Sequence, residues 1–198
     1  FNTAISDIEF VRQLSNIVSM SCEAVAKDAA MISIDEPILG VVVGVKFPFK
    51  YGSDEIIEIY NSIKKRCGDV PTGTHVCGRI SPTLASLLLH TDLDFLSHEF
   101  YDTPKNFEVY DPEGVRRSGK IMSVGCLSSK KPKVESVKEI LRIMEVSIKR
   151  YGPDMIFTPD CGFKNLIVEG SRELGYEASI KKLTNLVEAA GRLKESKP

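Results

Sequence analysis

His75 and Cys77 stand two residues apart near the end of the extended stretch VPTGTHVC, residues 70–77. Side chains alternate between the two faces of a strand, so we expect both residues to point to the same side. An imidazole beside a thiol supplies two of the four ligands that a zinc ion usually takes. The stretch therefore predicts half of a zinc site, and the other half must come from another part of the chain.

Other apolar stretches also end in residues that could bind a metal or a substrate. These residues are Asp35 and Glu36 in MISIDEP (31–37), Glu99 in LDFLSHE (93–99), and Asp160 and Cys161 in MIFTPDC (155–161). If these stretches are parallel strands, their C-terminal ends meet on one rim, and residues far apart in the sequence converge there. The pattern indicates a functional site on that rim.

Four of these residues form a donor set for one metal ion. His75, Cys77, Glu99 and Cys161 offer one nitrogen, two sulfur atoms and one carboxylate oxygen. Thiolates combined with an imidazole favour zinc over magnesium or calcium. Because the ligands come from separate strand ends rather than from a CxxC knuckle, the pattern favours a catalytic zinc site over a structural one.

The elements that must position these residues alternate between strands and helices. Apolar runs predict strands at 31–37, 70–77, 93–99, 120–127 and 155–161. Apolar residues at helical spacing predict helices at 5–30, 53–67, 81–88, 137–151, 165–174 and 179–194. Residues 40–52 are ambiguous, and 101–119 are expected to be loop with at most one short helix. The alternation predicts an α/β fold with parallel strands, as a covered sheet or a barrel wall.

The composition excludes several classes of protein. A net charge of −1, with acids and bases interspersed, gives no sign of binding to nucleic acid or to a membrane surface. No apolar run approaches the length of a membrane span. Five widely spaced cysteines favour free thiols in a reducing compartment, so we expect a cytoplasmic protein. Cys22 and Cys67 are expected in the core, whereas the sequence does not assign a role to Cys126. The basic run 130–133 is expected to be a solvated loop.

The order of the motifs resembles a known family. IDEP, H-x-C, D-F-L-S-H-E, V-E-S and PDCG follow one another as in the catalytic barrel of cobalamin-independent methionine synthase, in particular its short archaeal core form. The resemblance implies a (β/α)8 TIM barrel in which this chain covers about strands 4–8, without the first three strand units. Residues 1–198 would then be the C-terminal portion of a single TIM-barrel catalytic domain.

The resemblance also implies roles for the residues at the strand ends. The zinc ligands would be His75, Cys77, Glu99 and Cys161. Asp35 would bind the amino group of L-homocysteine, with Glu36 beside it as a further substrate contact. Asp160 would orient the metal site from behind, as carboxylates next to metal ligands commonly do.

The implied activity is that of a methyltransferase, in which a zinc-bound thiolate of homocysteine takes a methyl group and becomes methionine. Substrate would enter by displacing Glu99. The family's Asp-x-His-Ser pattern, whose histidine protonates a folate leaving group, falls on Cys126-Leu127-Ser128-Ser129 and lacks that histidine. A methylated corrinoid, free or protein-bound, therefore fits better as the donor than a methylated folate.

Three other functions remain open from the residues. A zinc enzyme of the same superfamily could methylate coenzyme M from a corrinoid, although IDEP and Glu99 favour an amino-acid substrate. A tetrapyrrole decarboxylase would need converging arginines, and only Arg79 lies near a predicted strand end. A non-catalytic, zinc-stabilised barrel would hold its metal in a closed site.

Overall fold

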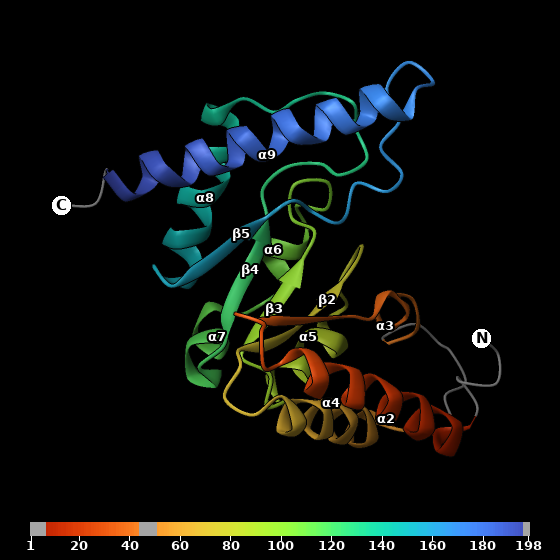
Figure 1. The fold of residues 1–198 in the computed structure, drawn as a ribbon. Coiled ribbons are helices and arrows are strands. Elements are labelled where there is room, and N and C mark those ends of the chain that lie inside the picture. Colours follow the sequence, from red (N-terminus) through yellow and green to blue (C-terminus); the bar gives the residue numbers. More distant parts are fainter. Residues whose placement is uncertain (1–6, 44–50, 196–198) are drawn as a thin grey trace. The chain divides into compact units, whose positions relative to one another are not determined.

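The computed structural model describes residues 7–43 and 51–195 (Figure 1). Its five strands form one sheet in the order β1-β2-β3-β4-β5. The pairs β1–β2 and β4–β5 are parallel, and helices connect the successive strands. These features confirm the predicted α/β fold with parallel strands. The chain divides into two compact units, and β3 (Phe95–His98) contributes residues to both.

The first unit comprises the chain up to Val76 together with 80–96 and 109–120. Its elements are α2 (Ile8–Val25), β1 (Ile32–Asp35), α3 (Pro37–Val42), α4 (Ser53–Cys67), β2 (Thr72–Val76), α5 (Pro82–Leu89) and α7 (Pro112–Ser118). Helices α2 and α4 pack side by side (Figure 1). Cys22 and Cys67 are buried in one cluster with Ile32 and Ile63, which confirms the prediction that both cysteines belong to the core.

The second unit comprises 77–79, 97–108 and the chain from Ile121 onward. Its elements are α6 (Asn106–Val109), β4 (Ile121–Gly125), α8 (Val137–Tyr151), β5 (Met155–Thr158) and α9 (Arg172–Glu195). Helix α8 begins with a capping box, in which Ser136 and Glu139 satisfy each other's backbone N–H groups. Helices α8 and α9 pack together in this unit (Figure 1).

The secondary structure differs from the prediction in three places. Residues 101–119 hold two short helices, and Asp111 with Pro112 supplies the cap and the first residue of the second. The predicted helix at 165–174 is wrong over 165–171, where Val168 and Ser171 form an isolated bridge, and one continuous α9 runs from Arg172 through the second predicted helix. Gly175 lets the helix approach the chain closely, because a Cβ there would lie 2.1 Å from the carbonyl oxygen of Leu166.

The structure describes the two ends of the ambiguous stretch 40–52. Its beginning belongs to α3, and its end supplies Gly52, the N-cap of α4. Residues 44–50 lie outside the described part of the chain. Across the described residues, no helix combines the length and the apolar character that a membrane crossing requires.

Candidate metal and substrate site

Strand β2 carries His75 and places Cys77 directly after its end. The strand is buried throughout, and its β-branched residues Thr72 and Thr74 suit the extended backbone. Beyond Cys77 the chain turns at Gly78, whose φ of 75° lies in the left-handed region that glycine tolerates. The two predicted ligands are thus fixed to each other by the strand and the turn that follows it.

Cys161 joins these two residues from the segment after β5. The sulfur atoms of Cys77 and Cys161 are 3.4 Å apart, and both cysteines are free thiols that are half-buried. One nitrogen of His75 and the two sulfur atoms all lie within 4.8 Å of one another. The structure therefore brings together three of the four residues predicted as metal ligands.

The three side chains fit a zinc ion in both chemistry and spacing. Two thiolates at the usual Zn–S distance of ~2.3 Å in a tetrahedral site stand ~3.8 Å apart. The observed separation of 3.4 Å comes within a few tenths of an ångström of that value. Sulfur and imidazole ligands select zinc rather than magnesium or calcium, and three protein ligands leave one position for a substrate.

The thiol of Cys77 holds its proton firmly in this setting. Burial raises the pKa of Cys77 to about 12, and the neighbouring Cys161 and Glu99 act in the same direction, while Lys130 acts against them. A thiol with this pKa is protonated at neutral pH. A metal ion bound at this position would itself displace the proton and stabilise the thiolate.

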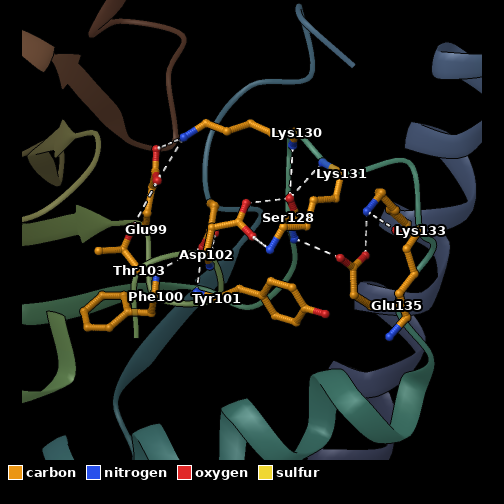
Figure 2. A network of polar contacts seen from close by, with 12 residues as sticks. Glu99, Phe100, Tyr101, Asp102, Thr103, Ser128, Lys130, Lys131, Lys133 and Glu135 are labelled. Carbon is orange, nitrogen blue, oxygen red and sulfur yellow. Dashed lines mark hydrogen bonds and ion pairs between the residues drawn. The ribbon is translucent and has the colours of Figure 1, made fainter. Parts of the chain in front are cut away.

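Glu99, the fourth predicted ligand, does not belong to the group of three. It follows β3 and is 1% exposed. The ammonium nitrogen of Lys130 lies 2.9 and 3.1 Å from its two carboxylate oxygens (Figure 2). The side-chain amide of Asn106 donates to the carbonyl oxygens of Glu99 and Gly78, at 2.7 and 2.9 Å, and so ties the segment of Glu99 to the turn after Cys77.

Asp160 joins the end of β5 to the end of β3. Its carboxylate accepts the backbone N–H groups of Phe100, Tyr101 and Asp102 at 2.9, 3.0 and 2.7 Å. Burial raises the pKa of Asp160 to about 6, although the three N–H donors oppose that rise. Because Cys161 is the next residue, Asp160 fixes the backbone that presents this predicted ligand.

The side chains of the basic run 130–133 are exposed, as predicted for a solvated loop, and the loop also carries an ordered network of polar contacts (Figure 2). The hydroxyl of Ser128 donates to Asp102 at 2.5 Å and accepts the N–H groups of Lys130 and Lys131. Lys131 pairs with the other carboxylate oxygen of Asp102 at 2.8 Å. The sequence held no spacing signal for these contacts, because they depend on how the loop folds back.

A buried ion pair anchors this loop to α9. Lys182 and Glu135 are both fully buried, and Lys182 donates to the Glu135 carboxylate at 2.6 Å and to the carbonyl oxygen of Lys133 at 2.5 Å. The other oxygen of Glu135 accepts the N–H of Ser128 at 3.1 Å. A buried pair is stable only when its remaining polar atoms are also satisfied, as they are here. Cys126, at the start of the loop, is fully buried, and burial raises the pKa of its thiol.

The two predicted substrate residues follow β1. Asp35 is exposed and pairs with His75 in the β1–β2 register. Glu36 donates its N–H to the carbonyl oxygen of His75 at 3.0 Å, and its carboxylate accepts the N–H of Ile38 as the N-cap of α3. Burial raises the pKa of Glu36. Both residues border a cavity of about 410 Å³ whose other walls are mostly apolar side chains of α2, α3 and α4.

The chain is similar to known proteins along most of its length. The family model described as "Cobalamin-independent synthase, Catalytic domain" matches residues 4–192. Curated relatives named methionine synthase include one from Methanothermobacter thermautotrophicus, 33% identical over 82% of this chain and 47% of its own. Another, from Methanocaldococcus jannaschii, is 26% identical over 95% of this chain and 57% of its own. The chain thus spans about half the length of these relatives.

Solved structures show the same fold. A B12-independent methionine synthase from Shewanella, solved in complex with selenomethionine, matches 95% of this chain and 55% of its own, with a TM-score of 0.70 and 16% identity. A vitamin-B12-independent methionine synthase from Listeria monocytogenes, designated putative, gives a TM-score of 0.65 at 17% identity. The fold is therefore that of the TIM-barrel synthases, as predicted. Together, the family match and the archaeal relatives establish that the chain belongs to the catalytic domain of the cobalamin-independent methionine synthase family.

Proposed function

We propose that the protein transfers a methyl group to the thiol of L-homocysteine and that this chain supplies the metal-binding part of the active site. The observation that carries the proposal is the convergence of His75, Cys77 and Cys161 within 4.8 Å. Zinc bound by these residues would lower the pKa of a coordinated thiol and so supply a nucleophile at neutral pH. The two cysteines would give the site the negative charge that keeps such a sulfur reactive.

Asp35 gives the site its preference for an amino-acid thiol. It lies opposite His75 on the neighbouring strand, and adjacent strands are ~4.8 Å apart. The exposed carboxylate can therefore hold an ammonium group while the sulfur of the same short molecule reaches the metal ligands. A thiol without an amino group, such as coenzyme M, leaves this carboxylate without a partner, so the arrangement favours homocysteine.

The loop after β4 bears on the methyl donor. Ser128, which stands where the resemblance places a histidine acid, is fully buried and donates its hydroxyl proton to Asp102. This hydroxyl is not arranged to protonate a leaving group. We therefore propose a methylated corrinoid as the donor, because its cobalt leaving group needs no proton.

The proposal is tested by incubating the zinc-loaded full-length protein with L-homocysteine and either methylcobalamin or a methylated folate, and measuring methionine. Methionine should form, and methylcobalamin should be the better donor. The variant Cys161→Ser should lose both zinc and activity, whereas Cys22→Ala, in the core cluster, should keep both. No methionine with either donor from a protein that holds zinc would overturn the proposal.

A further inference from the structure

The carboxylate of Glu99 needs a positive partner, because it is almost completely buried. Its side chain is 2% exposed, and an unpaired charge at that depth is strongly unfavourable. Lys130 supplies the partner through two contacts of 2.9 and 3.1 Å (Figure 2). The side chain of Lys130 is itself 58% exposed, so its ammonium group can return to water when another cation takes the carboxylate.

Contacts within the loop fix the backbone position of Lys130. Its backbone N–H donates to Ser128, which is bound to both Asp102 and Glu135. Glu135 is in turn held by the buried Lys182. The backbone at Lys130 is therefore anchored to a buried network, while only its side chain is free to move.

We propose that Lys130 is a positioning residue that holds Glu99 away from the metal and so keeps the fourth coordination position open for the substrate thiol. This inference rests on the proposed function. Two cations compete for one buried carboxylate: the metal at the group of three ligands and the ammonium of Lys130. Because Lys130 already pairs with Glu99, the buried carboxylate keeps a cationic partner when the thiol of homocysteine takes the fourth position.

Lys130 could act as a positioning residue for Glu99 or merely as a counter-ion for a buried charge. The two roles predict opposite effects of removing its charge on zinc affinity. Without Lys130, Glu99 loses its ammonium partner and keeps the hydroxyl of Thr103 at 3.4 Å, so it should bind the metal more persistently and resist displacement by a thiol. Zinc should then be held at least as tightly as in the wild type, while homocysteine binds more weakly. If Lys130 merely neutralised a buried charge, its loss would disturb the site and weaken zinc and homocysteine binding together.

The test uses the full-length protein loaded with Co²⁺ as a spectroscopic substitute for zinc, titrated with L-homocysteine. Zinc affinity without thiol is measured in parallel by competition with a chromophoric chelator. In Lys130→Met, the absorption change should need about tenfold more homocysteine, which corresponds to the loss of one charge-assisted contact. Lys130→Arg should restore the wild-type titration. Lys133→Met removes another lysine of this loop, one that pairs with the half-buried Glu139 of α8, and should leave the titration unchanged.

The outcomes separate this inference from the proposed function. A wild-type protein that binds no zinc, or whose cobalt spectrum does not change on addition of homocysteine, would overturn both the inference and the proposed function. A wild-type protein that responds to homocysteine while Lys130→Met responds at the same concentration would overturn the role of Lys130 alone. Loss of zinc affinity in Lys130→Met would do the same, because it would show a structural counter-ion.

Discussion

Asp35 and His75 are direct partners in the parallel pairing of β1 with β2. The next residue, Glu36, donates its N–H to the carbonyl oxygen of His75 at 3.0 Å, so the end of β1 is fixed to the strand that carries the metal ligands. A predicted substrate residue and a predicted metal ligand thus share one rung of the sheet. The proposed homocysteine site therefore depends on the pairing of two adjacent strands, β1 and β2.

The first prediction concerns Asp35→Asn, which keeps the shape of the side chain and removes its charge. We expect homocysteine to bind at least tenfold more weakly, because a charge-assisted contact to the ammonium group is lost. Binding of 4-mercaptobutanoate, which is homocysteine without its amino group, should not change. Zinc affinity should also stay the same. Equal losses for both thiols would show that Asp35 shapes the site rather than recognises the amine.

Much of the fold could be predicted from the sequence because the strands are short apolar runs with reactive residues at their C-terminal ends. Strand β2 shows this, since a single run fixed its position and the residues that follow it. From the sequence alone, Glu36 is interpreted as a substrate contact. An acidic residue before a proline is also typical of a helix N-cap, and in the structure Glu36 caps α3.

Other features could not be predicted because they depend on contacts between distant segments. The pairing of Lys130 with Glu99 joins residues 31 positions apart, and Lys130 lies in the loop between β4 and α8. In the sequence, Lys130 is one of several adjacent bases. Helix α9 is continuous from Arg172 to Glu195, and the close approach of Gly175 to the carbonyl oxygen of Leu166 is a contact that the sequence does not reveal.

The second prediction concerns crowding between β4 and β5. A Cβ at Gly125 would lie 2.1 Å from a carboxylate oxygen of Asp160 and 2.7 Å from its Cα atom. Gly125→Ala must therefore displace the backbone before Cys161. We expect a loss of about 1–3 kcal/mol in the free energy of unfolding, measured in urea, together with weaker zinc binding. At Gly162 a Cβ meets no atom within 4 Å, so Gly162→Ala is the matched control. Equal behaviour of the two variants would contradict the close approach.

The third prediction concerns the buried pair between α9 and the loop. Lys182→Met leaves the Glu135 carboxylate buried without a cation, which costs about 3–5 kcal/mol in the free energy of unfolding. Lys182→Met combined with Glu135→Leu should recover part of that loss, but not all, since Ser128 then lacks an acceptor for its N–H. The exposed neighbour serves as the control: Lys181→Met should change stability by less than about 0.5 kcal/mol. A single variant as stable as this control would refute the role of the pair.

The fourth prediction is a pH dependence of stability at the start of α8. The ammonium of Lys133 and the N–H and hydroxyl of Ser136 lower the pKa of Glu139 to about 2. The ionised carboxylate therefore stabilises the fold above its unfolded pKa of about 4.3, and this contribution is lost as the pH falls toward 2. Thermal unfolding between pH 5 and pH 3 should show a weaker acid dependence in Glu139→Gln than in the wild type. Parallel curves for the two proteins would rule out this contribution.

The central claim is that three protein ligands hold a zinc ion whose fourth position accepts the substrate sulfur. X-ray absorption at the zinc edge tests it most directly, because it counts the sulfur atoms around the metal. We expect two sulfur ligands, from Cys77 and Cys161, in the zinc form and three when L-homocysteine is bound. A sulfur count that stays at two in the presence of saturating homocysteine would contradict it.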